Sequence, residues 1–187
     1  TLRCIRTVND DAGAVVLSKN ESWILSGTTN ANFRCYKMSK GIGTIAAETC
    51  KVKNGVIIWL DQDGFYTIGD NRTPVRFHEL DAIFQSIDTS RITSAWAETY
   101  RGKYNKSNQY WCGITLGAGL TKNNYIFVYD FDSAGWVMFT GLPCDIFAKG
   151  ADSSENEILY GISDDGWIYE LDSGNDDNKK PIVSGFI

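Results

Sequence analysis

The chain has 187 residues, of which 43% are hydrophobic and 22% are charged, and its formal net charge is −5. This suits one soluble domain, or a piece of a larger one, with enough apolar residues for a packed core. The acidic balance argues against a nucleic-acid-binding domain, and no run approaches the roughly 18 apolar residues of a membrane span. We therefore expect no specific nucleic-acid recognition and no membrane span. No signal peptide is visible. Because the sequence starts at Thr1 rather than Met and ends on the apolar run PIVSGFI, we interpret it as a fragment.

Short apolar runs rich in Val, Ile, Tyr, Phe and Trp alternate with clusters of Gly, Asn, Asp and Ser. This pattern is typical of strands joined by turns, and helical periodicity is nearly absent. We expect a first group of strands near RCIRTVND (3–10), GAVVLSKN (13–20), SWILSG (22–27) and NFRCYKM (32–38). A second group follows near 44–53, 56–62, 65–71 and 74–79, after which LDAIFQSI (80–87) can form one or two helical turns.

A third group of strands is expected near 91–102, 108–116, 124–131 and 136–141, and a fourth near 144–153, 157–164, 167–172 and 181–187. Pro74 and Pro181 each open the last strand of their group. Because proline lacks an amide donor, it fits the first residue of an edge strand. The two prolines therefore support the alignment of the second group with the fourth.

Two stretches, NGVIIWLDQDGFYTIGD (54–70) and NEILYGISDDGWIYELD (156–172), match without a gap at an offset of 102 residues. Apolar residues match apolar residues, with Phe65 opposite Trp167. A tight hairpin needs φ > 0 at its central residues, which Gly adopts freely and Asp tolerates. Asp63-Gly64 and Asp165-Gly166 therefore predict two hairpin turns, and the repeat is a repeat of a β-hairpin.

The centres of the second strands, near Val16, Ile58, Cys112 and Tyr160, are separated by 42, 54 and 48 residues. Four antiparallel strands at this spacing are typical of a β-propeller blade. We therefore predict an all-β fold, namely a β-propeller or part of one, built of four-stranded antiparallel blades. The single propeller fragment spans 1–187, with about four blades at 3–40, 41–85, 86–141 and 142–187.

Six tryptophans would fill the spaces between blades: Trp23, Trp59, Trp96, Trp111, Trp136 and Trp167. A β-sandwich is the alternative architecture, since it also has short strands and frequent turns. It does not explain the gapless repeat or the paired prolines.

The single histidine, His78, lies in VRFHELD. A lone histidine at the end of an outer strand is more often a surface or hydrogen-bonded residue than a catalyst, and any serine or cysteine nucleophile would need it as the base.

The sequence has no GxSxG, Walker or GxGxxG motif. A carboxylate pair of the glycosidase type stays open, because spacing cannot show two carboxylates facing one another. Ser163-Asp-Asp-Gly166-Trp167 is similar to the box of propeller sialidases but has the wrong spacing, so we interpret it as a turn.

Three loops gather carboxylates that could hold calcium: Asp61-Gln-Asp63-Gly64, Asp130-Phe-Asp132 and Asp164-Asp165-Gly166. Calcium takes six to eight oxygen ligands, and these loops lack the further ligands of an EF-hand, so hairpin turns are favoured.

We interpret two charged segments as solvated loops: RGKYNK (101–106), which is the best basic patch, and the acidic DSGNDDNKKP (172–181). We predict no catalytic, binding or metal-site residue, no cofactor and no enzymatic activity.

The five cysteines, Cys4, Cys35, Cys50, Cys112 and Cys144, show neither CxxC nor zinc-like spacing. Most lie inside apolar runs, where a free cysteine behaves as a small buried hydrophobe. This favours a reducing compartment during assembly.

Several of these stretches together resemble the propeller proteins of bacteriophage tails and head–tail connectors. NGVIIWLDQDGFYTI is similar to the family's glycine, apolar strand, "DG" and aromatic strand, and VYDFDSAGWVMF (128–139) to its "YD…G-W" strand pair. ILYGISDDGWIYELDSGNDDNKKPI (158–182) resembles its "LY…DG-IY-LD-G…PI" ending, and SKNESWILSG its "Ser-x-Trp-x-Leu-x-Gly" strand. These are turn and packing residues, so no catalytic residue is carried over.

The resemblance implies a structural virion component that forms a ring with other copies of itself around the DNA conduit, beside neighbouring tail or portal proteins. An acidic chain suits such a lumen because it does not bind phosphates, and symmetric rings arise from heterologous contacts that close. The implied location is the virion, after assembly in the bacterial cytoplasm. Whole family members are usually longer. Two alternatives stay open: a carbohydrate- or protein-binding propeller for receptor recognition, and a glycosidase-type propeller enzyme.

Overall fold

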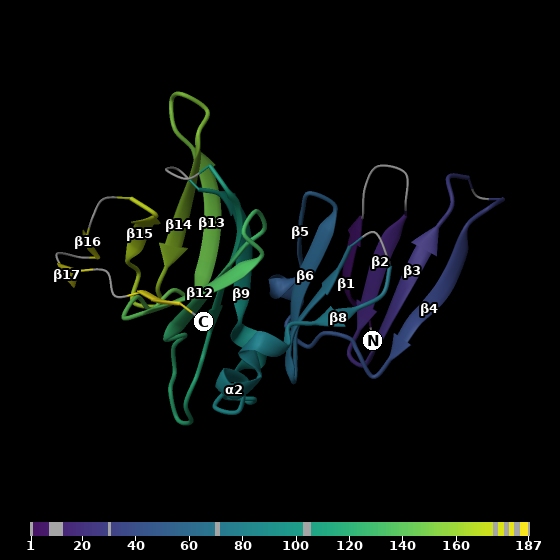
Figure 1. Ribbon diagram of the computed structural model, residues 1–187, viewed down its shortest axis with the longest axis horizontal. Coiled ribbons are helices and arrows are strands. Elements are labelled where there is room, and N and C mark those ends of the chain that lie inside the picture. Colours follow the sequence, from purple (N-terminus) through teal and green to yellow (C-terminus); the bar gives the residue numbers. More distant parts are fainter. Residues whose placement is uncertain are drawn as a thin grey trace. The chain divides into compact units, whose positions relative to one another are not determined.

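The computed structural model describes residues 2–7, 13–29, 31–69, 72–102 and 106–173, together with the backbone of 176–177, 180–181 and 184–186. In these residues the chain is all-β, and its strands form antiparallel sheets with only short helical turns between them (Figure 1). The chain divides into two compact units, Thr1–Gln85 and Ser86–Ile187. Among the residues described, no helix has the length and apolarity needed to cross a bilayer.

The first sheet contains β1 (Leu2–Thr7), β2 (Ala14–Ser18), β3 (Glu21–Ser26) and β4 (Arg34–Lys40), in that order. Burial alternates along β2 and β3, so that Val15, Leu17 and Ile24 are buried while the residues between them are half-buried. This alternation is typical of a sheet that packs on one face only. The strands predicted in this part of the chain are confirmed with slightly shifted ends.

The second sheet contains β5 (Lys51–Lys53), β6 (Val56–Asp61), β7 (Gly64–Ile68) and β8 (Val75–Arg76), again in chain order. Trp59 and Ile68 share a buried cluster with Val15 and Leu17 of the first sheet, so the core of this unit lies between the two sheets. On the opposite face, the Phe65 ring meets Phe84 edge to face at 5.4 Å.

Helical turns flank this sheet: η1 (Ala47–Thr49) before it, and η2 (His78–Leu80) and α2 (Asp81–Phe84) after it. The helical turns predicted over 80–87 are confirmed in α2. The predicted strand over 44–53 is wrong except for β5. The Thr49 hydroxyl donates to Ala46 O at 2.7 Å and the Thr44 hydroxyl donates to Leu60 O at 2.8 Å. Threonine hydroxyls bonded to the backbone in this way offer it an alternative to the strand ladder.

The second unit begins with η3 (Ile92–Ser94) and the strands of the third sheet: β9 (Trp96–Arg101), β10 (Asn108–Ile114), β11 (Tyr125–Asp130) and β12 (Gly135–Thr140). The fourth sheet contains β13 (Ile146–Ala151), β14 (Glu157–Ile162) and β15 (Ile168–Leu171). Trp111 and Ile126 of the third sheet share a buried cluster with Phe147 and Leu159 of the fourth. The core of this unit therefore also lies between two sheets.

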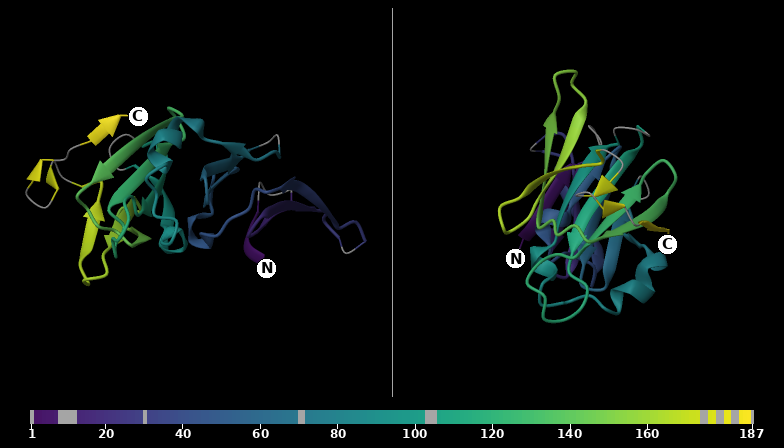
Figure 2. Two further views of the ribbon diagram at one scale, coloured as in Figure 1. Left: turned by 90° about the horizontal axis from the view of Figure 1, so that it is seen from below. Right: turned by 90° about the vertical axis from the view of Figure 1, so that its left-hand side faces the viewer.

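The end of the chain departs from the prediction. β16 (Asp176–Asp177) pairs with β17 (Lys180–Pro181), and β18 (Ser184–Phe186) pairs with β12 of the third sheet (Figure 2). The prediction that 181–187 forms the last strand of the fourth group is therefore wrong for β18. An apolar strand can pair with any free sheet edge, and β12 offers a row of amide and carbonyl groups that β18 completes.

Both copies of the repeat are antiparallel hairpins, as predicted: β6 pairs with β7 and β14 with β15. The turns are placed one residue earlier than predicted. Asp61 pairs with Gly64, so Gln62 and Asp63 occupy the centre of the first turn. In the second, the amide of Gly166 donates to Ser163 O at 3.1 Å and Gly166 has φ +89°. The glycine therefore follows the turn and provides the left-handed residue of a longer hairpin loop. Position 70, at the end of the first copy, lies outside the described residues.

The tryptophans divide into three groups. Trp59, Trp111 and Trp136 are buried, Trp23 and Trp96 are half-buried, and Trp167 is 64% exposed. The prediction of a core role is wrong for Trp167. Trp167 lies in the loop before β15. Its aligned partner Phe65, by contrast, lies within β7, a strand that is buried on both faces.

Candidate functional site

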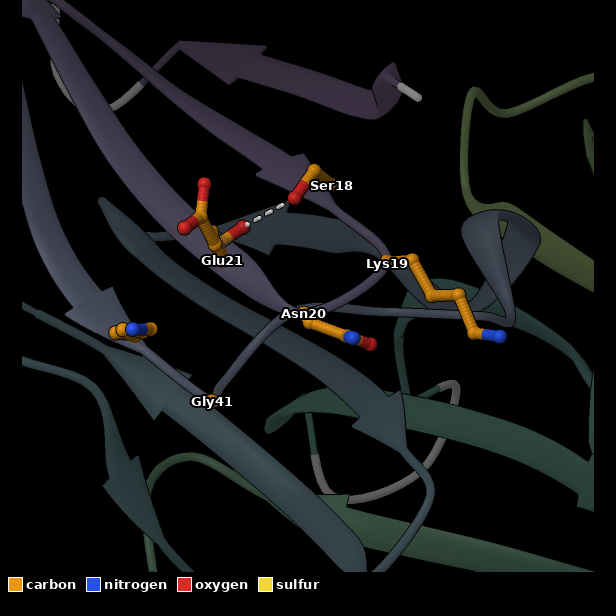
Figure 3. Close-up of a pocket in the computed structure, with 6 residues that line it drawn as sticks. Ser18, Lys19, Asn20, Glu21 and Gly41 are labelled. Carbon is orange, nitrogen blue, oxygen red and sulfur yellow. Dashed lines mark hydrogen bonds between the residues drawn. The ribbon is translucent and has the colours of Figure 1, made fainter.

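The hollow drawn in Figure 3 lies where the β2–β3 turn meets the end of β4, and its volume is about 430 Å³. Its lining residues are Ser18, Lys19, Asn20, Glu21, Lys40 and Gly41. The Ser18 hydroxyl donates to Glu21 O at 3.2 Å, while the side chains of Lys19 and Asn20 extend to the other side (Figure 3). None of the six is buried. The hollow is therefore an open surface feature with charged groups of both signs, and its lining gives no nucleophile with a neighbouring base.

The first predicted calcium loop holds a buried carboxylate. Asp61 is 4% exposed, and its Oδ2 accepts from the Gly43 amide at 3.0 Å, whereas its buried Oδ1 has no hydrogen-bond partner. Burial raises the pKa of Asp61 above its ordinary value. Asp63 lies on the outside of the turn, where it accepts from the Tyr66 hydroxyl at 3.0 Å. Burial and this hydrogen bond raise the pKa of Tyr66 to about 12.

An arginine ties this turn to the segment after β8. Arg76 donates from Nη2 to Asp63 O, and the same nitrogen lies 2.8 Å from Asp81 Oδ1. His78 Nδ1 lies 3.2 Å from Asp81 Oδ2, and the His78 side chain is 75% exposed. His78 is thus a surface residue in η2, bonded to a carboxylate. A surface position with a hydrogen-bonded ring is the one expected for it from the sequence.

The carboxylates of the two other loops contact groups within the loops and also groups outside them. Asp130 Oδ1 accepts from the amides of Asp132 and Ser133 at 2.9 and 3.0 Å. Asp165 Oδ1 accepts from the Ser163 hydroxyl, and the Lys122 ammonium forms ion pairs with Asp164 and Asp165. The hydrogen bonds of Asp130 and Asp165 within their loops are those of ordinary turns. In the described part of the chain, no three His, Cys, Asp or Glu side chains gather where they could share a metal ion.

The predicted basic patch lies on the β9–β10 loop. Arg101 and Lys106 are exposed, and Arg101 Nε donates to Lys106 O at 3.2 Å. Residues 103–105, the middle of RGKYNK, lie outside the described residues. The two positive charges of Arg101 and Lys106 therefore lie at the two ends of one loop. The Glu157 carboxylate accepts a hydrogen bond from the Arg101 amide at 2.7 Å.

The burial of the cysteines is confirmed for four of them, since Cys4, Cys50, Cys112 and Cys144 are buried and Cys35 is exposed. Cys4 of β1 and Cys50 before β5 belong to the same buried cluster. A hydrogen bond between the two thiols lowers the pKa of Cys4 and, with burial, raises the pKa of Cys50.

The fourth sheet leaves one apolar face exposed. Cross-strand pairing places Ile146, Ile162 and Ile168 side by side across the sheet, and we name them the fourth-sheet row. Ile146 is 40% exposed and Ile168 is 65% exposed. The next row on this face, Ala148, Tyr160 and Glu170, adds one carboxylate. The opposite face holds the buried residues of the core.

The first sheet has an equivalent outer face. Pairing places Ile5, Val16, Trp23 and Lys37 side by side across the sheet, and we name them the first-sheet row. Ile5 is 48% exposed, and the Lys37 ammonium lies 4.6 Å from the Trp23 ring centre. The neighbouring row on this face is Thr7, Ala14, Leu25 and Cys35.

The chain matches no protein-family model and no curated protein. The two rows are partly exposed apolar surfaces that the sequence analysis does not predict. The sequence does not show these faces, because AVVLS (14–18) is as continuously apolar as VIIWLD (56–61), and only the burial of the side chains in the structure separates the two strands.

Proposed function

We propose that this chain is a structural component of a bacteriophage virion, part of a tail or head–tail connector β-propeller that acts by assembly and not by catalysis. In this proposal the sheets are propeller blades and the whole protein forms a ring around the DNA conduit. Its partners are further copies of itself and neighbouring tail or portal proteins, and its location is the virion.

The observation that supports this proposal most is the strand order. The strands β1 to β4, β5 to β8, β9 to β12 and β13 to β15 pair consecutively within four sheets. Blades of a propeller are meanders of this kind. A β-sandwich instead exchanges strands between its sheets by Greek-key connections. Only β18 departs from consecutive order in these sheets, by pairing with β12.

Face-to-face packing supports the same proposal. A blade cannot bury its two faces alone, so neighbouring blades must cover them. Within each unit two sheets share one core, and β6 and β10 read as nearly continuous buried runs. Such runs suit a blade with a neighbour on each side. The resemblance of the turn and packing motifs to phage propellers adds the virion as the setting.

The experiment that tests this function is the native mass of the whole protein together with negative-stain images of the same sample. A closed ring, or a protein that sediments with phage particles, is the expected result. A monomer at all concentrations, absent from every virion fraction, would contradict the proposal.

An exposed aromatic residue favours a second candidate, a carbohydrate-binding propeller. Trp167 is 64% exposed and lies in the same loop as Asp164 and Asp165, which form ion pairs with the Lys122 ammonium. Exposed aromatic rings beside polar groups suit sugar binding. Titration with a glycan panel, followed by tryptophan fluorescence, should then give saturable binding that the variant Trp167→Ala loses.

A further inference from the structure

Two buried thiols lie together where the first sheet packs against the second. Cys4 belongs to β1, and Cys50 directly precedes β5. Both are free cysteines, and both belong to the buried cluster between the two sheets. Their side chains are in hydrogen-bond contact with each other. Two sulfur atoms that are far apart in the sequence are therefore neighbours in the core of the first unit.

The backbone around the two thiols is held in place from both sheets. Cys4 and Arg6 are two positions apart on β1 and so lie on the same face of that strand. Arg6 Nε donates to Cys50 O at 2.8 Å. The strands β1 and β5 are in contact. One strand therefore provides both a thiol and the guanidinium group that fixes the backbone of the second cysteine.

Cys4 is the more reactive of the two thiols. The hydrogen bond with Cys50 lowers the pKa of Cys4, burial acts in the opposite direction, and the Arg6 guanidinium adds to the lowering. Since the thiolate is the reactive form of cysteine, Cys4 reacts first with an oxidant. Among the described residues β1 is an edge strand that pairs with β2 alone. A strand held by a single ladder opens locally more easily than a central strand, which gives a small oxidant access to Cys4.

We propose that Cys4 and Cys50 form a reversible disulfide that locks the first sheet to the second when hydrogen peroxide is present. The Cys4 sulfur attacks one peroxide oxygen, the O–O bond breaks, and Cys4 becomes a sulfenic acid while one water leaves. The Cys50 sulfur then attacks the Cys4 sulfur, the S–S bond forms, the S–O bond breaks and a second water leaves. Two thiols thus lose two electrons and two protons, and one peroxide is reduced to two waters.

This site goes beyond the proposed function and does not rest on it, because both cysteines belong to one copy of the chain. In a reducing compartment the pair stays as two thiols, and thiol–disulfide exchange returns the oxidised pair to that state. The disulfide would close the loop between residues 4 and 50, which contains the rest of the first sheet. A cross-link that closes a long loop restricts the unfolded chain and so stabilises the fold.

Peptide mapping of the full chain tests the proposal without any substitution. The folded protein is treated with hydrogen peroxide, catalase stops the reaction, and remaining thiols are alkylated after unfolding. Trypsin then releases CIR (4–6) and GIGTIAAETCK (41–51). The expected product is one species that joins these two peptides and is two hydrogens lighter than their sum. Its rate of formation should not change over a tenfold range of protein concentration, and dithiothreitol should restore the two separate peptides.

Three results of the mapping would overturn the proposal. The first is alkylation of both peptides after peroxide treatment, since the thiols then stay reduced. The second is a CIR peptide that carries a sulfinic acid, since Cys4 then reacts without a resolving partner. The third is a linked species whose formation accelerates with protein concentration, since the bond then joins two copies.

Thermal unfolding measures the locking effect. The variant Cys35→Ser is the background, because it removes the exposed thiol of the same unit and leaves the pair intact. Peroxide should raise its unfolding temperature by about 5 °C or more, and dithiothreitol should reverse the rise. The matched control adds Cys50→Ala, with circular dichroism to verify folding, and should show no rise. An equal rise in both proteins, or a linked peptide without any rise, would contradict the lock.

Discussion

Arg6 of β1 donates from Nε to the backbone oxygen of Cys50, 2.8 Å away, and so joins the first sheet to the segment that enters the second. The bond is partly buried and lies beside the cluster that contains Cys4 and Cys50. The hydrogen bond therefore connects a side chain of the first sheet, that of Arg6, with the backbone at Cys50, which leads into the second sheet. Its removal leaves a carbonyl group without its donor.

We therefore expect Arg6→Met to destabilise the protein. Methionine keeps the aliphatic stem but removes the donor, and a buried acceptor left unpaired costs about 1–3 kcal/mol. The measurement is the urea midpoint followed by tryptophan fluorescence. Arg3→Met is the control, because Arg3 is exposed, and such surface changes stay within about 0.5 kcal/mol. Equal losses for the two variants would contradict the role of the bond.

The repeat gives a matched pair of aromatic truncations. Phe65 is fully buried, whereas its aligned partner Trp167 is 64% exposed. Phe65→Ala should cost about 3–5 kcal/mol, because it leaves a cavity against Phe84. Trp167→Ala should change stability by less than about 0.5 kcal/mol. Thermal unfolding of both variants measures the difference, and a large loss for Trp167→Ala would show that a further element covers this side chain.

Gly43 lies where a side chain does not fit. A Cβ there would be 2.3 Å from Ser18 O and 2.7 Å from the Asn20 amide nitrogen, both backbone atoms. Gly43→Ala should therefore cost about 1–3 kcal/mol or more, as overpacking does. Gly69→Ala is the control, since nothing lies within 4 Å of its Cβ position. Chemical unfolding measures the free energy of unfolding of both variants. An equal decrease in the two would contradict overpacking at Gly43.

The buried Asp61 makes stability depend on pH. Burial raises its pKa, so the folded state keeps the proton to higher pH than the unfolded state does. The free energy of unfolding therefore falls as pH rises from below the ordinary value of 3.8 through the raised value, and is constant above it. Asp61→Asn removes the charge and keeps an oxygen for the Gly43 amide.

We expect Asp61→Asn to equal the native protein near pH 3 and to be more stable near pH 7, by about 1.4 kcal/mol for each unit of the pKa increase. Urea unfolding at several pH values measures this gap. Glu155→Gln is the control, because Glu155 is an exposed loop residue. A gap that is the same at both pH values would exclude the ionisation of Asp61 as its cause.

The local parts of the fold could be predicted because turn chemistry lies within a few residues. Asp63-Gly64 and Asp165-Gly166 indicate their hairpins with no information from elsewhere in the chain, and each hairpin is present. The exact turn centre was missed by one residue, because a glycine can occupy the turn or the position after it. The helical turn of α2 was found for the same local reason.

What depends on distant partners could not be predicted. The pattern of 181–187 indicates a strand but not the edge to which β18 pairs. Phe65 and Trp167 occupy equivalent places in the repeat, yet their exposure is set by what packs on each sheet. The buried Asp61 accepts a hydrogen bond from the Gly43 amide, and the sequence alone does not place these two residues side by side. The propeller, the ring and the virion setting stay predictions.

Consecutive pairing of the strands also determines when each sheet can form during synthesis. The first sheet is complete once Lys40 has left the ribosome, and the second once Arg76 has done so. Sheets built from neighbouring strands close short loops, which favours rapid folding and shortens the time for which an apolar edge is open to aggregation. β18 is the exception, since it reaches β12 only after the whole fourth sheet has been made. The edge of the third sheet is therefore the last part of the ladder to be completed.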